Sequence, residues 1–311
     1  MKIVFMGTPD FAVNTLEALI KAGHEIALVV TQPDKAKGRG KKLVYSAVKE
    51  SALGHGLLVA QPEKVRDEEF VEKLRKIAPE VIVVVAFGQI LPESILSMPK
   101  FGCVNVHASL LPEYRGAAPI QWAVIDGLEK TGVTTMYMDK GLDTGDIIEQ
   151  RTIDIAPDET GGSLFDKLAV LGGEIIVDTL DSLEKGTASR TPQDNNKSSY
   201  AKMLNKDMGH IDFNEDAAKI ERLIRGLNPW PSAYTSIDGK MLKIYRATVE
   251  DDENLTVVKP GTVIAVDKKS FTVCCGKGTL KILNLQLEGK KRMDTDAFLR
   301  GYEVKEGAVL V

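Results

Sequence analysis

The run Val81–Val85 constrains the fold of this chain more than any other segment. All of its residues are β-branched, so the segment has no polar face to turn towards water. Continuous runs of this kind are typical of central strands in parallel sheets, which helices cover on both faces. Short apolar runs at 3–6, 26–30 and 103–107 alternate with helical patterns, and this alternation predicts an α/β domain with right-handed crossovers.

The pattern changes after a long helix that we expect over 160–183, interrupted at Gly172-Gly173. Residues 190–206 are polar and rich in turn formers, which is typical of an exposed linker. Beyond one further helix, about five short strand-like runs are separated by tight turns, which favours a small β-barrel with an OB-like fold and leaves sandwich-like arrangements open. The predicted boundaries are an α/β domain at 1–189, a linker at 190–206 and a barrel domain at 207–311.

Length, charge and cysteine content limit the classes of protein that fit. A chain of 311 residues suits about two domains, and its net charge of −4 gives no global reason to bind nucleic acid. No apolar stretch is long enough to cross a bilayer, and residues 1–7 indicate a first strand, not a signal peptide. Three cysteines without CxxC pairs argue against a disulfide framework or a zinc site. We therefore expect a cytoplasmic protein without a metal site or membrane contact.

Asn105 and His107 are the first candidates for chemistry. They stand two positions apart on the predicted strand 103–107, so their side chains point to the same side of the sheet. Open α/β sheets bind ligands at the carboxyl ends of their strands. There a carboxamide can donate a hydrogen bond to a developing oxyanion, and an imidazole can move protons near neutral pH. Taken alone, the pair also fits a buried histidine with its hydrogen bonds satisfied and an asparagine that closes a turn.

Two polar loops follow this strand. The segment 138–146 contains Gly141 and Gly145, which imply unusual backbone dihedrals or close approach to a ligand. Asp143, between these glycines, could orient and stabilise an imidazolium. Arg115, in the nearer loop, could bind an anion or pair at the surface. For the composition of 138–146 alone, a hydrophilic hairpin loop is the commoner outcome.

These segments together resemble the formyltetrahydrofolate-dependent formyltransferase family. The motifs that carry the resemblance are Asn105-x-His107, the sequence SLLPEYRG at 109–116 and Asp143 within the sequence GLDTG. The combination is far more specific than any of its parts. Further segments are similar to the branch of the family that acts on methionyl-tRNA, namely GTPDF at 7–11, TQPD at 31–34, GRGKKL at 38–43 and NPWP at 228–231.

The resemblance implies a Rossmann-like catalytic domain before the OB-like domain, and it implies a reaction. The free amine of methionine on initiator tRNA would attack the formyl carbon of 10-formyltetrahydrofolate, which is the donor and co-substrate. Asn105 and protonated His107 would stabilise the oxyanion of the tetrahedral intermediate, and His107 would pass a proton towards the folate nitrogen. Asp143 would hold His107 or an ordered water and favour the protonated imidazole. Neither a metal nor an obligate protein partner is implied.

The resemblance also implies a donor pocket after the buried strand 81–85, where family members hold the pterin ring by main-chain groups. Apolar walls would come from the segment that follows His107. The residues expected to bind the donor are Phe87, Gln89, Ile90, Leu91, Ser109, Leu110, Leu111 and Pro112. Without the resemblance, the leucines of these segments indicate ordinary core packing.

Arg39, Lys41 and Lys42 lie in a glycine-containing loop after the second predicted strand. Basic loops near an active site suit phosphate contacts, although a solvated charged loop is the commoner outcome. In the branch that acts on methionyl-tRNA, the equivalent insertion contacts the acceptor end of the tRNA, so we predict that these three residues bind tRNA. Further cations at 268–269 and 290–292 fit either one basic stripe on the barrel or scattered loop tips.

Three alternatives stay open at this point. A formyltransferase acting on a small-molecule amine, such as a nucleotide sugar or glycinamide ribonucleotide, would share Asn105, His107 and Asp143 but would not need the basic loop. A dinucleotide-dependent oxidoreductase is disfavoured, because the sequence GTPD and not GxGxxG follows the first strand. A non-catalytic RNA-binding protein is disfavoured by the complete set of three polar residues.

Overall fold

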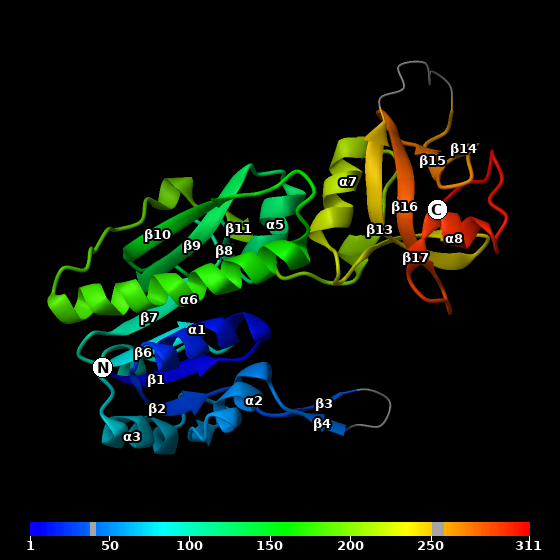
Figure 1. The fold of residues 1–311 in the computed structure, drawn as a ribbon. Helices are drawn as coiled ribbons and strands as arrows, with labels where there is room; N and C mark the ends of the chain where they lie inside the picture. Colours follow the sequence, from blue (N-terminus) through cyan, green and yellow to red (C-terminus); the bar gives the residue numbers. More distant parts are fainter. Residues whose placement is uncertain (38–41, 251–257) are drawn as a thin grey trace. The chain divides into compact units, whose positions relative to one another are not determined.

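The computed structural model describes residues 1–37, 42–250 and 258–311 (Figure 1). The chain forms two compact units. The first unit comprises Met1–Pro119, Lys130–Asp154 and Phe165–Ala201, and the second comprises Ile120–Glu129, Ile155–Leu164 and Lys202–Val311. Two short segments inside the N-terminal half therefore belong to the second unit, and nothing in the sequence pattern sets them apart from their neighbours.

A seven-stranded mixed sheet organises the first unit. Its strands are β1 (Lys2–Gly7), β2 (Glu25–Val30), β5 (Val59–Ala60), β6 (Val81–Val85), β7 (Cys103–His107), β9 (Lys130–Tyr137) and β10 (Ile147–Asp154), in the order β10-β9-β7-β6-β1-β2-β5. Strands β5, β2, β1, β6 and β7 run parallel, whereas β9 and β10 are antiparallel to their neighbours. All five residues of β6 are buried at the centre of the sheet, which confirms the prediction for this run.

Helices cover both faces of this sheet. They are α1 (Asp10–Lys21), α2 (Ala47–Gly54), α3 (Glu68–Ile77), α4 (Glu93–Leu96) and α6 (Gly161–Lys185). On one face, Met6 of β1 and Val84 of β6 share a buried cluster with Leu74 of α3. On the opposite face, α6 lies against the sheet where Gly172 approaches Val106 of β7. The first unit is thus a doubly covered α/β layer structure, as the Rossmann-like prediction requires.

The glycine pair in α6 corrects one expectation, because the helix continues through Gly172-Gly173 without interruption. A Cβ atom at Gly173 would lie 2.8 Å from the backbone oxygen of Asn14 and 3.2 Å from Cβ of Ala18, both in α1. The glycines therefore permit close packing of two helices and do not break the helix. Although α6 has 25 residues, it is not apolar enough to cross a membrane, and the same holds for every other helix in the described ranges.

The polar segment 190–201 is part of the first unit. Thr191 exchanges two backbone hydrogen bonds with Ile147. Further on, β11 (Tyr200–Ala201) pairs in parallel with β8 (Arg115–Gly116), and the 3-10 helix η1 (Asn195–Lys197) lies between these contacts. In the first half of the chain, β3 (Lys35–Lys37) and β4 (Lys42–Val44) form a short antiparallel hairpin.

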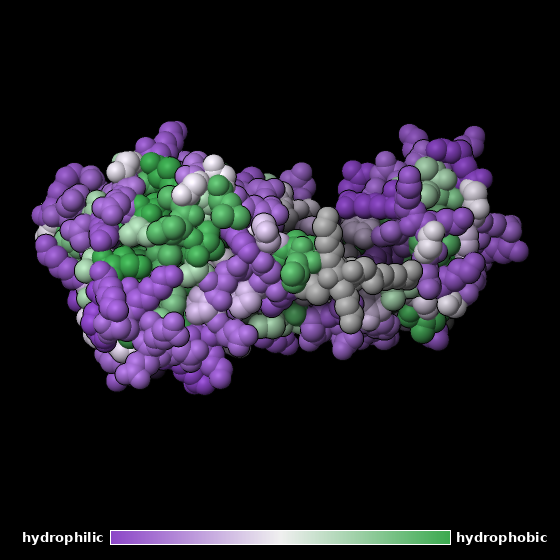
Figure 2. All heavy atoms as spheres, turned by 90° about the horizontal axis from the view of Figure 1, so that it is seen from below, coloured by the Kyte–Doolittle hydropathy of each residue, from purple (hydrophilic) through white to green (hydrophobic). Residues whose placement is uncertain are grey.

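One face of the first unit carries hydrophobic residues, which Figure 2 shows gathered among hydrophilic ones at the left of that view. The large apolar side chains that are exposed in this unit include Leu58, Ile90, Leu142 and Val170. Exposed apolar atoms are normal on globular proteins, so this surface alone points to no ligand.

An antiparallel sheet organises the second unit. Its strands are β12 (Ala233–Ile237), β13 (Lys240–Glu250), β14 (Val263–Val266), β15 (Phe271–Cys274), β16 (Thr279–Leu287) and β17 (Met293–Asp294), and its helices are α5 (Pro119–Ile125), η2 (Asp207–Gly209), α7 (Ala217–Gly226) and α8 (Thr295–Leu299). The order is β12-β13-β16-β15-β14, and β17 pairs with β16. Ile224 of α7 and Phe298 of α8 belong to the hydrophobic core of this unit.

The last residues of the chain join the two edges of this sheet. Val311 exchanges backbone hydrogen bonds with Ser236 of β12, at 2.8 and 3.1 Å. On the other side, the amide of Leu310 donates to the oxygen of Gly261 at 2.8 Å, just before β14. The C-terminal segment therefore closes the sheet into a small barrel, in agreement with the predicted OB-like architecture.

The three cysteines lie inside the two units as free thiols. Burial raises the pKa of Cys103 and of Cys275 to about 12, and it raises the pKa of Cys274 as well. These thiols are therefore protonated at neutral pH, and reactive cysteine chemistry has no support here.

We predict that Gly173→Ala destabilises the protein by about 1–3 kcal/mol, because the added methyl group would press on the backbone of α1. The matched control is Gly54→Ala at the end of α2, where no atom lies within 4 Å of an added Cβ. This control should gain about 0.4–1 kcal/mol through the unfolded chain. Urea unfolding of both variants decides the point, and an equal gain at both sites would contradict the close-packing explanation.

Candidate active site

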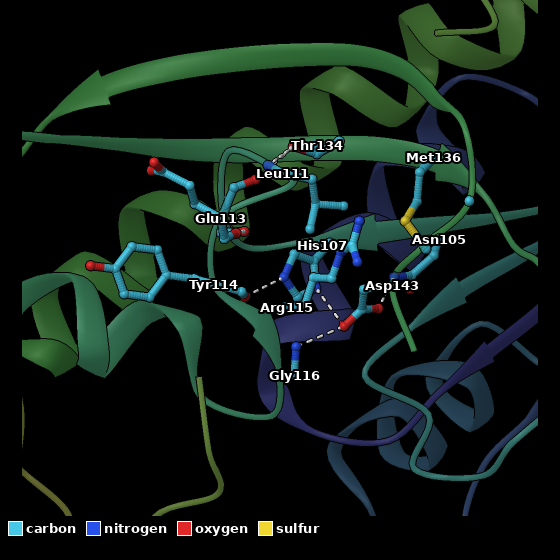
Figure 3. A network of polar contacts seen from close by, with 12 residues as sticks. Asn105, His107, Leu111, Glu113, Tyr114, Arg115, Gly116, Thr134, Met136 and Asp143 are labelled. Carbon is cyan, nitrogen blue, oxygen red and sulfur yellow. Dashed lines mark hydrogen bonds and ion pairs between the residues drawn. The ribbon is translucent and has the colours of Figure 1, made fainter. Parts of the chain in front are cut away.

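The candidate site lies on one face of β7, near its carboxyl end (Figure 3). Asn105 and His107 are buried there, with 8% and 6% exposure. The amide nitrogen of Asn105 donates to Oδ1 of Asp143 at 3.4 Å, and Nδ1 of His107 lies 3.6 Å from Oδ2 of the same carboxylate. The structure therefore brings together the three residues that the sequence analysis selected, although Asp143 is far downstream.

A main-chain carbonyl fixes the orientation of the imidazole. Nε2 of His107 lies 2.9 Å from the oxygen of Tyr114. A carbonyl oxygen only accepts, so Nε2 carries a proton and Nδ1 is the atom that faces Asp143. The distance of 3.6 Å is too long for a direct hydrogen bond, so the pair is in electrostatic contact only. Across the described ranges, no group of three His, Cys, Asp or Glu side chains could hold a metal ion.

The Asp143 carboxylate is held in a left-handed loop. The backbone of Asp143 has a φ of 54°, a conformation that a non-glycine residue adopts only when its surroundings enforce it. Oδ2 accepts from the amide of Gly116 at 2.9 Å, while Gln193 donates to the main-chain oxygen of Asp143, also at 2.9 Å. Contacts on both sides therefore enforce this conformation and aim the carboxylate at His107.

Thr134 of β9 organises the loop that follows β7. Its hydroxyl donates to the oxygen of Ser109 at 2.6 Å and accepts from the amide of Leu111 at 3.1 Å. Gln150 of β10 donates both to this hydroxyl and to the oxygen of Leu111, each at 2.9 Å. These bonds hold residues 109–111 in place. The chain continues from them to Tyr114, whose oxygen contacts the imidazole. No sequence pattern indicated Thr134, because the two atoms of the loop that it binds are main-chain atoms.

Arg115 and Gln193 also belong to the site, and sequence reasoning assigned Arg115 only a general anion-binding or surface role. Arg115 is 9% exposed, and its guanidinium donates to Oε1 of Gln193 at 3.1 and 2.7 Å. It donates as well to Oδ1 of Asn195 at 2.9 Å. Both acceptors are neutral amides from the segment that the sequence analysis treated as a linker. A polar composition is compatible with either role, so the pattern could not reveal this packing.

The first segment expected to bind the donor follows β6. The side chains of Phe87 and Leu91 are in the hydrophobic core, whereas Ile90 is 86% exposed. The oxygen of Phe87 accepts from the Thr8 hydroxyl at 3.1 Å, and the Gln89 side chain accepts from a main-chain amide at 3.0 Å. Phe87 and Leu91 can therefore offer a ligand only main-chain atoms, whereas Ile90 can also offer its side chain.

The second segment expected to bind the donor follows β7. Ser109 and Leu111 are buried, with 1% and 3% exposure, and Leu110 and Pro112 are half-buried. Because β6 and β7 are neighbouring parallel strands, both segments begin at the same sheet edge.

Of the three residues predicted to bind tRNA, the structure describes one. Arg39 and Lys41 lie outside the described residues, and Lys42 is the first residue of β4. Beside the hairpin, Lys49 of α2 donates to Asp34 at 2.6 Å. This hydrogen bond, together with a second from Gln61, holds the pKa of the Asp34 carboxyl below its usual value. An ion pair thus fixes the chain just before the hairpin begins.

Two family models match the chain. The model described as formyl transferase matches residues 1–180, and the model described as formyl transferase, C-terminal domain, matches residues 203–303. The chain therefore belongs to the formyl transferase family, and the resemblance seen in its motifs is confirmed.

Named relatives extend this similarity over the whole chain. The methionyl-tRNA formyltransferase of Lachnospira eligens is 59% identical over 313 residues, which cover 100% of this chain and 99% of the relative. The protein of the same name from Agathobacter rectalis is 58% identical and covers 99% of both chains. The one from Geobacter metallireducens is 52% identical and covers 99% of this chain and 97% of its own.

Solved structures share the fold at lower identity. The N-formyltransferase of Helicobacter canadensis, in complex with folinic acid and dTDP-3-aminofucose, has a TM-score of 0.66 and 21% identity, covering 91% of this chain and 98% of its own. HypX from Aquifex aeolicus, in complex with tetrahydrofolic acid, has a TM-score of 0.65 and 17% identity, covering 99% of this chain and 50% of its own. These likenesses concern the fold alone.

We predict that Thr134→Val destabilises the protein by about 1–3 kcal/mol, because the oxygen of Ser109 and the amide of Leu111 would each lose their bond to the buried hydroxyl. Thr15→Val is the matched control, since the buried Thr15 hydroxyl has no hydrogen-bond partner in the described part of the chain. Removing that hydroxyl should be neutral or stabilising. Chemical unfolding measures both variants, and a neutral Thr134→Val would refute the role given to this hydroxyl.

Proposed function

We propose that the protein transfers the formyl group of 10-formyltetrahydrofolate to the free amino group of methionine on initiator tRNA, for translation initiation in the cytoplasm. The observation that carries the proposal is that Asp143, from the loop between β9 and β10, meets Asn105 and His107 of β7. The acceptor is supported by the names of the relatives at 52–59% identity, which match this chain over its full length.

Asn105 and His107 supply the charge stabilisation that the first step needs. When the amine attacks the formyl carbon, the C=O electron pair moves to oxygen and leaves an oxyanion. The Asn105 amide has a second N–H besides the one directed at Asp143, and this N–H can donate to the oxyanion. A proton on Nδ1 of His107 makes the ring cationic, and the facing carboxylate of Asp143 balances this charge.

The second step breaks the bond between the formyl carbon and the folate nitrogen. The attacking nitrogen, positively charged in the adduct, gives up one proton, and the departing folate nitrogen takes one up. His107 is the group that can exchange these protons, because the imidazolium can give its Nδ1 proton to the departing nitrogen and the neutral ring can then take one from the attacking nitrogen. Asp143, 3.6 Å from Nδ1, stabilises the charged form of the ring at the start and at the end of this exchange. The exchange is balanced, since one C–N bond forms, one C–N bond breaks and nothing is oxidised or reduced.

The two substrates are proposed to bind at different parts of the first unit. We propose that the donor binds along the main chain of 87–91 and against residues 109–112, at the shared edge of β6 and β7. We propose further that Arg39, Lys41 and Lys42 contact phosphates of the tRNA acceptor end. No metal and no obligate protein partner enter this proposal.

We predict that His107→Ala and Asp143→Asn each lower kcat/KM for formyl transfer by about 100-fold or more, since groups of these kinds contribute that much. The assay uses charged initiator methionyl-tRNA and 10-formyltetrahydrofolate, with tRNA binding measured separately and expected to be unchanged. His55→Ala is the control, because this histidine pairs with Glu17 and is 39% exposed. Activity above about a tenth of wild type in His107→Ala would refute its assigned role.

The same assay separates the two acceptor classes. If the wild-type protein formylates an amino nucleotide sugar or glycinamide ribonucleotide and leaves methionyl-tRNA unchanged, the small-molecule alternative is correct and the tRNA proposal fails.

We predict that replacing Arg39, Lys41 and Lys42 together by Ala weakens the tRNA step and flattens its salt dependence. The log–log slope should fall by roughly 0.7–0.9 for each phosphate that the variant no longer neutralises. The apparent affinity for 10-formyltetrahydrofolate should stay the same. Steady-state kinetics at two salt concentrations test this. The charge-matched control replaces Lys73, Arg75 and Lys76 of α3 by Ala. Equal effects of the two triple variants would show that the loop acts only through net charge.

A further inference from the structure

Gln193 makes hydrogen bonds in two opposite directions. Its Nε2 donates to the main-chain oxygens of Asp143, at 2.9 Å, and Gly145, at 2.7 Å. Its Oε1 accepts twice from the guanidinium of Arg115, at 3.1 and 2.7 Å. Gln193 lies between the segments that the two family models match, 1–180 and 203–303. A side chain from the connecting segment therefore bridges two loops of the site.

Both loops that Gln193 bridges contact His107 or carry Asp143. On the Nε2 side lies Asp143, whose left-handed backbone needs support from its surroundings. On the Oε1 side, Arg115 stands between Tyr114, whose oxygen accepts from His107, and Gly116, whose amide donates to the Asp143 carboxylate. Gln193 thus ties the turn that orients the imidazole to the loop that carries its carboxylate.

We propose that Gln193 is a positioning residue of the active site and that its amide keeps the Asp143 carboxylate opposite Nδ1 of His107. The consequence for catalysis rests on the proposed function, whereas the bridge itself does not. The chemistry selects an amide, because one end must donate to two carbonyl oxygens while the other end accepts from a guanidinium. A carboxylate would satisfy Arg115 but would present lone pairs to both carbonyl oxygens.

The segment that carries Gln193 has its own anchors. Thr191 exchanges two backbone hydrogen bonds with Ile147, at 2.8 and 3.0 Å. On the other side, Ser199 accepts from the amides of Tyr114 and Arg115, at 2.8 and 2.9 Å. Substitution of the Gln193 side chain should therefore leave the segment in place and the protein folded.

The first experiment needs no substrate. Hydrogen exchange is measured on the peptide covering 139–146 in wild type, Gln193→Ala, Gln193→Glu and Asn195→Ala. Asn195 is the matched control, since it accepts from Arg115 at 2.9 Å and no hydrogen bond joins its side chain to residues 143–145 in the described part of the chain. Exchange should become faster in both Gln193 variants and stay at the wild-type rate in Asn195→Ala. Unchanged exchange in Gln193→Ala would overturn the proposal.

The second experiment separates positioning from stability. In both Gln193 variants kcat should fall about 10- to 100-fold, because a displaced catalytic group costs this much, while KM for each substrate stays within about twofold. Asn195→Ala should keep kcat within about threefold. A Gln193→Glu variant with wild-type kcat would mean that the residue only balances the charge of Arg115, and the proposal would be wrong.

The two readouts also separate this proposal from the proposed function. If the wild-type protein does not formylate methionyl-tRNA, the proposed function fails, and exchange in 139–146 still decides whether the bridge exists. If exchange becomes faster in Gln193→Ala while kcat stays at the wild-type value, the proposed function stands and the positioning role is refuted.

Discussion

The antiparallel pairing of β9 with β7 is the constraint on which the candidate site depends. It sets His107 opposite Thr134, and it returns the chain to the start of β7, where the amide of Met138 donates to the oxygen of Cys103 at 2.8 Å. The loop that follows then reaches the polar face of β7 and brings Asp143 to the imidazole.

The sequence predicts those parts of the fold that depend on residues close together in the chain. An uninterrupted β-branched run can be stable only under two covered faces, and β6 shows this arrangement. The glycine pair of α6 shows where local reasoning fails. Helix propensity disfavours Gly172-Gly173, but the backbone of Asn14 occupies the space that a side chain would need. That neighbour is distant in sequence, so no pattern within the helix could reveal it.

The residues of the candidate site also differ in how far the sequence predicts them. The period of a strand suffices to place Asn105 and His107 on one face. For Asp143 the residues alone offered an imidazolium partner as one possibility, and the family resemblance selected it, because a polar loop between glycines has many commoner explanations. Thr134 and Gln193 left no signal at all, since Thr134 holds the loop after β7, and Gln193 the loop of Asp143, through main-chain atoms, which every residue possesses. Side chains that organise a site by binding main-chain atoms are therefore the residues that are hardest to predict from a sequence.

The way in which residues 307–311 complete the barrel has a consequence for the solubility of shortened chains. These residues pair with Ser236 of β12 and with Gly261 and Val263 at β14. A chain cut at 306 would retain the core around Phe298 but would leave the backbone groups of these three residues without those partners. Unprotected strand edges pair readily with other chains. The loss of a few terminal residues would therefore appear first as self-association, before any loss of helix content.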